Sequence, residues 1–512
     1  MSGSIVNLGT IGSRFRDAEH LAVIDLSDPD APRRVSYPEF HAACDGVARA
    51  LVARGLTPGD RVGVYCSNRL EFLVVFYGAM RAGVSPVMMG ILQPADTIAW
   101  IVEQTEVRLV FCEAELRANL PEGTEAVLVD GDGADSLARF SDPGPFEPFA
   151  PDHDSVAFVA FTSGSTGRPK AALLSHRAHS WVARTISEDR DFSPEDAIIV
   201  ASPLYHKHAM NSIKCALWGG STIILLRKFE VRAYVGAMNR YRPTVVSGVP
   251  TIYAMILQQR DLLQGNDYSF VRLATMGGAP ASDQLIDSVS ELFPRARINL
   301  IFGITETSAA LFGNHPEGAD RPRHSIGFPI AGNELRLVGG ESDDFGVLHV
   351  RGPGMMNGYL NNPAEMARRY DAEGWFNTGD VMRRDATGWY YFVGRSDDMF
   401  TTSGHNVYPA EVELVIERHE DVEQAIVVPA PDEIKHAVPY AFVVRRMGAT
   451  LTEDDVKQHV LRNAPPYQHP RKVIFLEALP MTNVGKIDRR RLEAEARRIK
   501  AGQQQKAQAN GE

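Results

Sequence analysis

The sequence predicts an α/β protein with a large N-terminal domain and a small α+β C-terminal domain. Helical and strand patterns alternate through the first three quarters of the chain, which is typical of layered α/β architecture. The residue pattern changes after Arg395, where a polar, turn-rich segment precedes a second compact set of predicted helices and strands. The chain has 512 residues, more than one hydrophobic core usually serves. We therefore expect an N-terminal domain over residues 1–394, a hinge over 395–398, a C-terminal domain over 399–500 and a disordered tail over 501–512.

The N-terminal elements follow from their periodicity. Residues 37–56 carry apolar side chains at helical spacing, with a glycine stop at Gly55. Residues 61–66 predict a strand, and residues 70–84 predict a largely buried helix. The same rhythm returns at two further apolar runs, "STIILL" and "INLIF". Near residue 385, two alternating runs flank the turn sequence Asp-Ala-Thr-Gly, which predicts a β-hairpin.

The C-terminal elements form a shorter series. The patterns predict helices over residues 410–419 and 452–464. They predict strands over residues 423–429, 440–446 and 472–477. This is enough secondary structure for a small domain with a core of its own.

The overall composition is that of an ordinary globular protein, with 44% hydrophobic and 23% charged residues. The net charge of -11 argues against a nucleic-acid or anionic-membrane partner. No apolar run is long enough for an integral membrane segment, and the first residues do not resemble a signal peptide. Four scattered cysteines suit reduced thiols, so we expect a cytoplasmic protein. The sequence leaves monomer and homodimer both open.

One loop gives the strongest local indication of a ligand-binding site. "FTSGSTGRPK", residues 161–170, follows the apolar run "SVAFVAF", so the loop is expected to leave the end of a buried strand. Glycines let backbone N–H groups turn toward a ligand, hydroxyls add donors and Lys170 adds a positive charge, which together suit phosphate oxygens. The loop is not a Walker A motif, because Pro169 precedes the lysine and Ala171 follows it. Composition alone would also fit a flexible surface loop.

Four further segments accompany this loop in a fixed order. They are "FGITETS" (302–308), "NTGD" (377–380), "GRSDDMFTTSGHNVYPAEVE" (394–413) and "PMTNVGKIDRR" (480–490). Together the five segments resemble the motifs of the acyl-adenylate-forming superfamily, which includes acyl-CoA synthetases, adenylation domains and firefly luciferase. The resemblance covers nearly the whole chain. It implies a large adenylate-forming domain followed by a small mobile lid domain.

The resemblance also implies the chemistry. A carboxylate attacks the α-phosphate of ATP to give acyl-AMP and pyrophosphate, and the thiol of coenzyme A then displaces AMP. ATP, Mg²⁺ and coenzyme A are the expected cofactors, and a small carboxylic acid is the expected substrate. Two anions meet in the first step, so the site must neutralise charge and align the reacting groups.

Roles carry over residue by residue. The loop residues implied to bind ATP are Thr162, Ser163, Gly164, Ser165, Thr166, Gly167 and Lys170. Thr305 would contact the α-phosphate and Glu306 would bind Mg²⁺, a hard ion that suits a carboxylate and phosphate oxygens. The residues implied to lie against the adenine are Gly278, Ala279 and Pro280. Asp380 would accept hydrogen bonds from the ribose with the help of Arg395.

Two positions concern the lid. Lys486 is implied to bridge the incoming carboxylate and the α-phosphate, and it is our strongest catalytic candidate. Asp397 matches the hinge position at which the small domain rotates between the half-reactions. Taken singly, each assigned residue also has an ordinary interpretation: a solvated strand end for Glu306, a turn aspartate for Asp380 and a surface lysine for Lys486.

The acid is less determined. The segments implied to border it contribute His206, Val249, Met276, Gly303 and Ile304. Most of these are apolar, which favours an aliphatic or aromatic acid. The stretch "PLYHKHAMN" has no acidic residue to pair with an ammonium group, which lowers the case for an amino acid. His206, Lys207 and His208 leave a dicarboxylic acid open.

The main prediction is therefore an ATP-dependent acid–CoA ligase. The alternatives are a stand-alone enzyme that loads an acyl group onto a carrier protein and a non-catalytic protein that kept the fold. The presence of Lys170, Glu306, Asp380 and Lys486 argues against the last. The sequence does not identify the role of His405, which stands where many relatives have another residue.

Overall fold

The computed structural model describes residues 6–162, 169–308, 310–432, 435–446, 448–481 and 487–509. Its contacts divide the chain into two compact units. The first holds residues 1–279, 288–335 and 350–376, and the second holds residues 280–287, 336–349 and 377–512. The segment predicted as a hinge, 395–398, falls within the second unit. The predicted domain boundaries stay a prediction.

One sheet of the first unit has the strand order β13-β12-β11-β9-β10-β1-β2. Its strands are β1 (Leu21–Leu26), β2 (Arg33–Ser36), β9 (Ala197–Val200), β10 (Thr222–Leu226), β11 (Val245–Gly248), β12 (Leu273–Gly277) and β13 (Arg297–Ile301). All neighbours are parallel except β1 and β2. The runs Ile198–Val200 and Ile223–Leu226 are buried, as expected for strands that are covered on both faces. The predicted strands at "STIILL" and "INLIF" are confirmed as β10 and β13.

A second sheet of this unit has the order β18-β8-β7-β4-β3-β5-β6. Its strands are β3 (Arg61–Tyr65), β4 (Ser85–Met88), β5 (Val110–Cys112), β6 (Ala126–Leu128), β7 (Val156–Thr162), β8 (Lys170–Ser175) and β18 (Gly358–Tyr359). The neighbours among β7, β4, β3, β5 and β6 are parallel, whereas β8 is antiparallel to both β7 and β18. The loop within residues 161–170, which we call the phosphate-type loop, therefore joins two antiparallel neighbours, β7 and β8.

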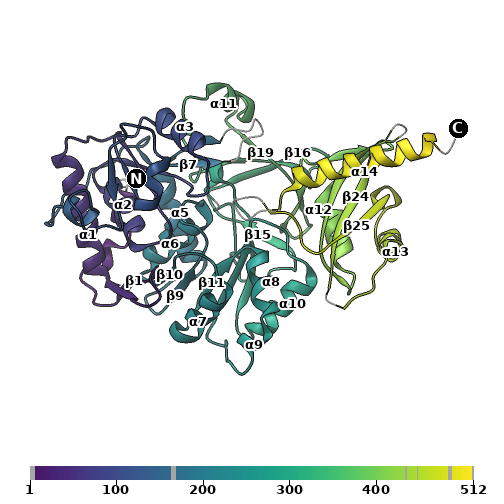
Figure 1. Ribbon diagram of the computed structural model, residues 1–512, viewed down its shortest axis with the longest axis horizontal. Coiled ribbons are helices and arrows are strands. Elements are labelled where there is room, and N and C mark those ends of the chain that lie inside the picture. Colours follow the sequence, from purple (N-terminus) through teal and green to yellow (C-terminus); the bar gives the residue numbers. More distant parts are fainter. Residues whose placement is uncertain are drawn as a thin grey trace. The chain divides into compact units, whose positions relative to one another are not determined.

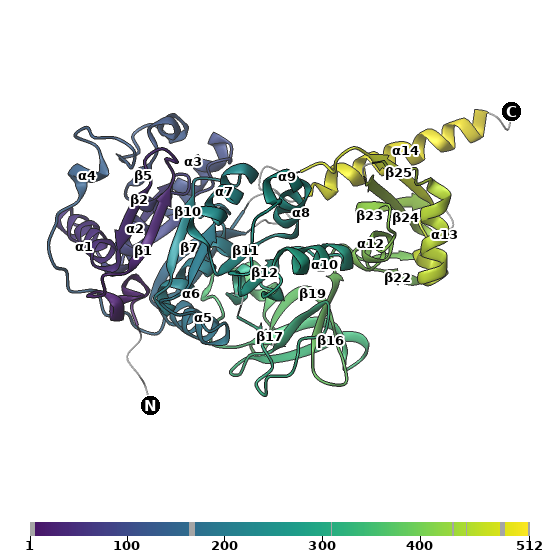
Figure 2. The same cartoon turned by 90° about the horizontal axis from the view of Figure 1, so that it is seen from below.

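Helices fill the space between these sheets (Figures 1 and 2). Helices α1 (Tyr37–Ala53) and α2 (Leu70–Arg81) pack on each other, and α5 (His176–Asp189) packs on α6 (Lys207–Gly219). Helix α5 also contacts β7 and β8, while α6 contacts β9 and β10, so this pair connects the two sheets. The predicted helices over 37–56 and 70–84 are confirmed as α1 and α2. Ser36 and Glu39 form a capping box at the start of α1.

The second unit contains the predicted hairpin. Strands β19 (Phe376–Arg384) and β20 (Tyr390–Arg395) are antiparallel, with Asp380 opposite Arg395. The turn between them is closed by the backbone N–H of Gly388, which donates to Asp385 O at 3.0 Å. The Asp385 carboxylate accepts from the N–H of Thr387 at 2.9 Å. These contacts are those of an Asp-initiated, Gly-terminated turn.

The remaining part of this unit is built on a small sheet. Its strands are β21 (Phe400–Thr402), β22 (His405–Val407), β23 (Val422–Asp432), β24 (His436–Arg445) and β25 (Lys472–Leu476). Side chains of β23 and β24 alternate between the two faces. Val427 and Val443 pack with helices α12 (Pro409–Glu417) and α13 (Glu453–Asn463), whereas Phe442 packs with α14 (Arg489–Ala509) on the other face (Figure 2). All the helices and strands predicted for residues 410–477 are confirmed.

The chain end differs from the prediction. Helix α14 continues to Ala509, so residues 501–509 are helical where we expected a disordered tail. Alanine and glutamine make up seven of the nine residues 501–509, and both are good helix formers, which lets the preceding helix continue. Within the described residues, none of the helices combines the length and the apolar character needed to cross a membrane.

Candidate active site

Most of the predicted acid-binding and metal-binding residues lie at one edge of the first sheet. Strands β9, β11, β12 and β13 are parallel neighbours, so their carboxyl ends share an edge, where open α/β sheets bind ligands. The predicted residues that follow these strands are His206, Val249, Gly278, Ala279, Gly303, Ile304, Thr305 and Glu306. The fold therefore gathers residues that are up to a hundred positions apart in the sequence.

The glycine after β12 has a structural requirement. Gly278 has a φ of +83°, and a Cβ at this position would lie 3.5 Å from Val249 Cγ1. The backbone conformation favours glycine, which keeps this edge open. Met276 is buried and pairs with Gly248, while Thr275 pairs with Ser247. The Met276 and Thr275 side chains therefore lie on opposite faces of the sheet. Pro280 belongs to the second unit.

The turn that carries Thr305 and Glu306 is a short 3₁₀ segment, Thr305–Thr307. The Tyr359 hydroxyl donates to Glu306 Oε1 at 2.6 Å. The backbone N–H of Met356 donates to Glu306 O at 2.9 Å. Burial and then the neighbouring Glu306 carboxylate raise the pKa of Tyr359 above its ordinary value, so the phenol remains a donor at neutral pH. Tyr359 thus orients the Glu306 carboxylate, and the contact from Met356 holds the backbone that carries it.

Two lysines of α6 support the same turn. Lys207 Nζ donates to Thr305 O and lies 3.5 Å from Ile304 O. Lys214 contacts His179 Nδ1, and His179 Nε2 lies 2.9 Å from the Ser308 hydroxyl. Burial and then the charge of Lys214 hold the pKa of Lys207 well below its usual value. Burial lowers the pKa of Lys214 to about 7.

The residues at the two ends of the phosphate-type loop lie next to each other on the neighbouring strands β7 and β8. Thr162 ends β7, Lys170 begins β8, and the two residues are paired in register. Lys170 forms an ion pair with Glu365, and the exposed fractions of these side chains are 10% and 3%. Glu365 also contacts Arg368, and it lies 3.3 Å from Arg369 Nε. One buried carboxylate therefore contacts three cations.

Several predicted residues cannot be placed. Ser163, Gly164, Ser165, Thr166 and Gly167 lie outside the described residues, and so does Lys486. The segment that contains Lys486 is bounded by a β-bridge between Met481 and Ile487. The backbone N–H of Asp488 also donates to Pro480 O at 2.8 Å.

The donor set fits Mg²⁺ held together with a nucleotide. Among the described residues, no group of three or more His, Cys, Asp or Glu side chains is placed to hold a metal ion. Mg²⁺ is commonly bound by one or two carboxylates, with substrate phosphates and waters as its other ligands. Glu306 supplies one carboxylate, with Oε1 engaged by Tyr359. This arrangement suits an ion that arrives with phosphate oxygens.

The predicted ribose-binding pair lies in the second unit. Arg395 Nη1 is 2.9 Å from Asp380 Oδ1, and Arg395 Nη2 is 3.6 Å from Asp397 Oδ2. Burial alone would lower the pKa of Arg395, but the Asp380 and Asp397 carboxylates raise it above its usual value. Asp380 is buried, and its position is held by the cross-strand register. The structure therefore brings Asp380, Arg395 and the hinge candidate Asp397 together.

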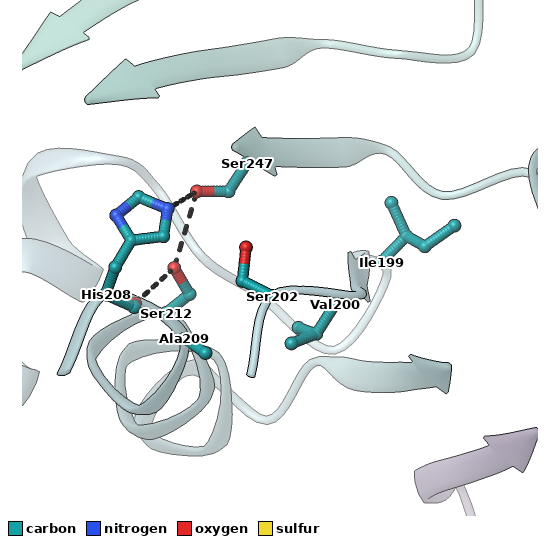
Figure 3. Close-up of a pocket in the computed structure, with 7 residues that line it drawn as sticks. All are labelled: Ile199, Val200, Ser202, His208, Ala209, Ser212 and Ser247. Carbon is teal, nitrogen blue, oxygen red and sulfur yellow. Dashed lines mark hydrogen bonds between the residues drawn. The ribbon is translucent and has the colours of Figure 1, made fainter. Parts of the chain in front are cut away.

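A small cavity lies between α6 and strands β9 and β11, and His206 is not among the residues that line it. His206 itself packs against Tyr205, with ring centroids 4.6 Å apart. The cavity has a volume of about 10 Å³ and is lined by Ile199, Val200, Ser202, His208, Ala209, Ser212 and Ser247 (Figure 3). Burial lowers the pKa of His208 to about 4, so its imidazole is neutral at neutral pH.

Sequence reasoning missed four residues that support the site. Tyr359 contacts Glu306, Glu365 contacts Lys170 and His179 contacts Ser308, while Lys214 contacts His179. The string "NNPAEMARR" does signal a helix start, and Asn362 Oδ1 accepts from the N–H of Glu365 at 3.1 Å. The pairing of Glu365 with Lys170 spans 195 positions, so no local pattern could have indicated it.

Comparisons with known proteins find similarity along most of the chain. The family model "AMP-binding enzyme" matches residues 13–360, and the model "AMP-binding enzyme C-terminal domain" matches residues 411–486. The chain is 29% identical to 4-coumarate–CoA ligase 3 of Arabidopsis thaliana, over 90% of this chain and 86% of the plant protein. It is also 29% identical to 4-coumarate–CoA ligase 2 of Oryza sativa subsp. japonica, over 91% and 90%.

A solved structure extends the similarity to the fold. The ATP-bound MatB protein of Rhodopseudomonas palustris superimposes with a TM-score of 0.86 at 28% sequence identity. The alignment covers 96% of this chain and 99% of that protein. The predicted fold class, a large α/β domain with a small C-terminal domain, is confirmed.

Proposed function

The chain belongs to the AMP-binding enzyme family and is an AMP-forming acid–CoA ligase, and from this premise we propose that it acts on an apolar aliphatic or aromatic carboxylic acid. It uses ATP, Mg²⁺ and coenzyme A. One observation carries the proposal. Val249 and Ile304 stand at the same sheet edge as the turn of Thr305 and Glu306. The aromatic acid in the names of the plant relatives supports including aromatic acids among the candidates.

The first half-reaction joins two anions. The acid's carboxylate oxygen attacks the α-phosphorus of ATP, the bond to the bridging oxygen breaks, and pyrophosphate leaves with its electron pair. We assign Thr162, Lys170 and the loop between them to the pyrophosphate part of ATP. The position of Lys170 opposite Thr162, at the start of β8, supports this assignment, because an ammonium group can bind phosphate oxygens. Thr305 would meet the α-phosphate, and Lys486 would bridge it to the carboxylate.

The turn at Glu306 would hold Mg²⁺, which would supply positive charge to the phosphate oxygens. Tyr359 keeps the Glu306 carboxylate in one orientation through its 2.6 Å hydrogen bond, and such outer contacts commonly tune a ligand. Asp380 would accept hydrogen bonds from the ribose hydroxyls. Arg395 Nη1 lies 2.9 Å from Asp380 Oδ1 and so fixes the position of this carboxyl group.

The second half-reaction replaces AMP by a thiol. The sulfur of coenzyme A attacks the acyl carbon, the bond to the phosphate oxygen breaks, and AMP leaves as the thioester forms. We assign Asp397 to the hinge that exchanges the two arrangements of the lid. Its position two residues after Arg395, where β20 ends and the Asp397 side chain is exposed, supports this assignment because hinges are commonly a few residues at the end of an element.

Product analysis tests the proposal. The purified protein is given ATP, Mg²⁺ and a panel of aliphatic, aromatic and dicarboxylic acids, with and without coenzyme A, and the products are identified by mass spectrometry. Acyl-CoA together with AMP is expected from an apolar or aromatic acid. Turnover of dicarboxylic acids alone would contradict the proposed substrate class. Acyl-AMP that accumulates whether or not coenzyme A is present would instead indicate a carrier protein as the acceptor.

A further inference from the structure

Three buried polar side chains connect two helices to the turn that carries Thr305 and Glu306. Lys214 of α6 contacts His179 Nδ1 of α5, and His179 Nε2 lies 2.9 Å from Ser308 Oγ at the end of the turn. The exposed fractions of Lys214, His179 and Ser308 are 3%, 0% and 0%. No step assigned to ATP or to the acid uses Lys214 or His179, so that chemistry does not explain their burial.

The burial of Lys214 is costly, and no anion compensates it. Among the ion pairs of the described residues, none includes Lys214. The titratable groups that act on it are Lys207 and Cys215 of the same helix and His179 of α5. Burial raises the pKa of the Cys215 thiol, so this group is not an anion at neutral pH. Because a methionine would fill similar space without this cost, we expect the amine to serve a purpose other than packing.

The contact with Lys214 determines which nitrogen of His179 carries the proton. A lysine ammonium group has N–H donors and no acceptor, so His179 Nδ1 must accept from it. Burial and then the charge of Lys214 hold the pKa of His179 well below its usual value, so the imidazole is neutral and has one N–H. That N–H is on Nε2, and it donates to Ser308 Oγ. Lys214 thus gives His179 a donor directed at the turn.

Ser308 needs such a contact because of its backbone conformation. Its φ is +58°, in the left-handed region that residues other than glycine seldom adopt. At the other end of the turn, Lys207 donates to Thr305 O. Lys207 and Lys214 are seven positions apart, about two turns of α6, so they lie on one face of this helix. Helix α6 therefore holds the turn at both ends, directly through Lys207 and, through His179, at Ser308.

We propose that His179 and Lys214 are positioning residues for the binding of ATP with Mg²⁺: they fix the turn at Ser308, and thereby the Glu306 carboxylate two residues away. Neither His179 nor Lys214 touches ATP in this assignment. The inference rests on the proposed function, since the role of Glu306 is assigned there. It goes beyond that function by naming two residues, one from α5 and one from α6, on which the metal-binding arrangement depends.

Calorimetry with ATP tests the inference without the unidentified acid. ATP is titrated into the wild type and into His179→Leu, once with Mg²⁺ and once with EDTA. With Mg²⁺, His179→Leu should bind ATP about tenfold more weakly than the wild type, as for other losses of an outer contact to a metal ligand. With EDTA the difference should be about threefold or less, because Glu306 then has no ion to bind.

Two further variants keep the test decisive if His179→Leu does not fold. His179→Gln retains an amide N–H that can reach Ser308 Oγ, so most of the Mg²⁺-dependent affinity should return. Lys214→Met removes the ammonium group but keeps the imidazole, and it should lose about threefold with Mg²⁺. A lost positive charge acting on ATP directly would instead weaken binding with EDTA as well.

A matched control separates positioning from stability. His176 is an equally buried histidine of α5, and its Nδ1 accepts from the N–H of Leu8 rather than from Lys214. His176→Leu should therefore lower the thermal midpoint, because a buried N–H loses its partner, and should leave the affinity for ATP with Mg²⁺ unchanged.

The tautomer of His179 gives a readout that does not depend on ATP. Protein with ¹⁵N-labelled histidine is observed by NMR at pH 6, below the Lys214 pKa of about 7. The His179 signals are those that are missing from His179→Gln. A protonated Nε2 with an unprotonated Nδ1 is expected in the wild type, and a mixture of the two tautomers is expected in Lys214→Met.

The outcomes separate the inference from the proposed function. The inference is overturned if the His179 and Lys214 variants bind ATP with Mg²⁺ as the wild type does, if they lose as much affinity with EDTA, or if wild-type His179 carries its proton on Nδ1. Glu306→Gln is the reference variant. If it leaves Mg²⁺-dependent binding of ATP unchanged, the role assigned to Glu306 is wrong and the inference fails with it. A loss in Glu306→Gln without a loss in the His179 variants overturns the inference alone.

Discussion

The buried Glu365 carboxylate offsets the positive charge of the three cations around it. Its carboxylate is 3% exposed and pairs with Lys170, while Arg368 and Arg369 approach it from the same helix. Removing it would leave three cations close together without their shared anion. Breaking a buried ion pair from one side costs much more than losing a surface pair.

We therefore expect Glu365→Ala to lower the free energy of unfolding of the first unit by about 3 kcal/mol. Thermal or urea unfolding measures the change. Asp344→Ala is the control, because the Asp344–Arg384 pair has exposed fractions of 54% and 40%; its cost should stay below about 1 kcal/mol. Equal losses in the two variants would show that Glu365 carries no special charge role.

Lys214 makes the stability depend on pH. Burial lowers its pKa from the usual 10.5 to about 7 in the folded protein. Between these values the unfolded chain binds one more proton than the folded chain, so raising the pH favours folding. The contribution of Lys214 should increase stability from about pH 7 to about pH 10.5, by at most about 1.4 kcal/mol per pH unit. Below pH 7 this contribution no longer changes.

Replacing Lys214 by Met should flatten this part of the pH profile. The thermal midpoint of the wild type and of Lys214→Met is measured at intervals from pH 6 to pH 10. The difference between the two should be largest near pH 7, where the buried amine carries its full cost, and should shrink as the pH rises. Parallel profiles over the whole range would mean that Lys214 does not titrate in this window.

Helix α13 illustrates how elements combine local and tertiary signals. Thr452 accepts from the N–H of Asp455 at 3.2 Å, and Asp455 accepts from the N–H of Thr452 at 2.9 Å, which completes a capping box. One turn further on, Val456 and Val460 enter the core shared with α12 and the small sheet. The cap sets where the helix begins, and the two valines determine the face that it buries.

The cap should contribute measurably to the stability of the second unit. Thr452→Ala is expected to cost about 1 kcal/mol, because the N–H of Asp455 loses its partner and the Asp455 carboxylate loses the Thr452 hydroxyl. Gln458→Ala, an exposed mid-helix change, should alter the free energy of unfolding by less than about 0.5 kcal/mol. Urea unfolding followed by far-ultraviolet circular dichroism compares them. A loss at Gln458 as large as that at Thr452 would argue against the capping contribution.

At the scale of the whole molecule, two units divide the assigned chemistry. Lys170, Thr305 and Glu306 belong to the first unit, whereas Asp380, Arg395 and Lys486 belong to the second. An enzyme with two half-reactions can use such a division, because a residue needed in one step can be withdrawn in the next. Lys486 is the residue for which this expectation is sharpest.

Lys486→Ala should separate the half-reactions. Acyl-AMP formation is expected to fall about 100-fold or more, as for the loss of a preorganised charge in a transition state. Thioester formation from supplied acyl-AMP should stay within a few-fold of the wild type. Single-turnover assays measure each step, and Lys457→Ala, which removes a lysine paired with Glu453, is the control. An equal fall in both steps would contradict the assigned role.

Local patterns were sufficient for much of the architecture. The helices α1 and α2, the strand before the phosphate-type loop and the hairpin around Asp385 all appear where periodicity and turn residues placed them. Such signals depend on residues within a few positions of each other. The motif residues around Thr305 and Asp380 were likewise visible as strings, and the resemblance supplied the roles that we propose for them.

Other features required distant segments to meet. The pairing of Lys170 with Glu365, the contact of Lys207 with the Thr305 backbone and the cavity at Ser202 each join side chains from separate elements. From the sequence alone, Lys207 was a candidate to bind the second carboxylate of a dicarboxylic acid. In the folded protein α6 lies against the turn after β13, and Lys207 donates to the Thr305 backbone there.

The chain's periodicity and motifs thus established its secondary structure, its fold class and its family. Burial, long-range pairing and the charge state of groups such as His208 and Lys214 were settled only in the folded molecule. The physical reason is the separation along the chain over which each kind of interaction acts. Periodicity and turn chemistry act between near neighbours, whereas desolvation and ion pairing depend on which surfaces the fold excludes from water.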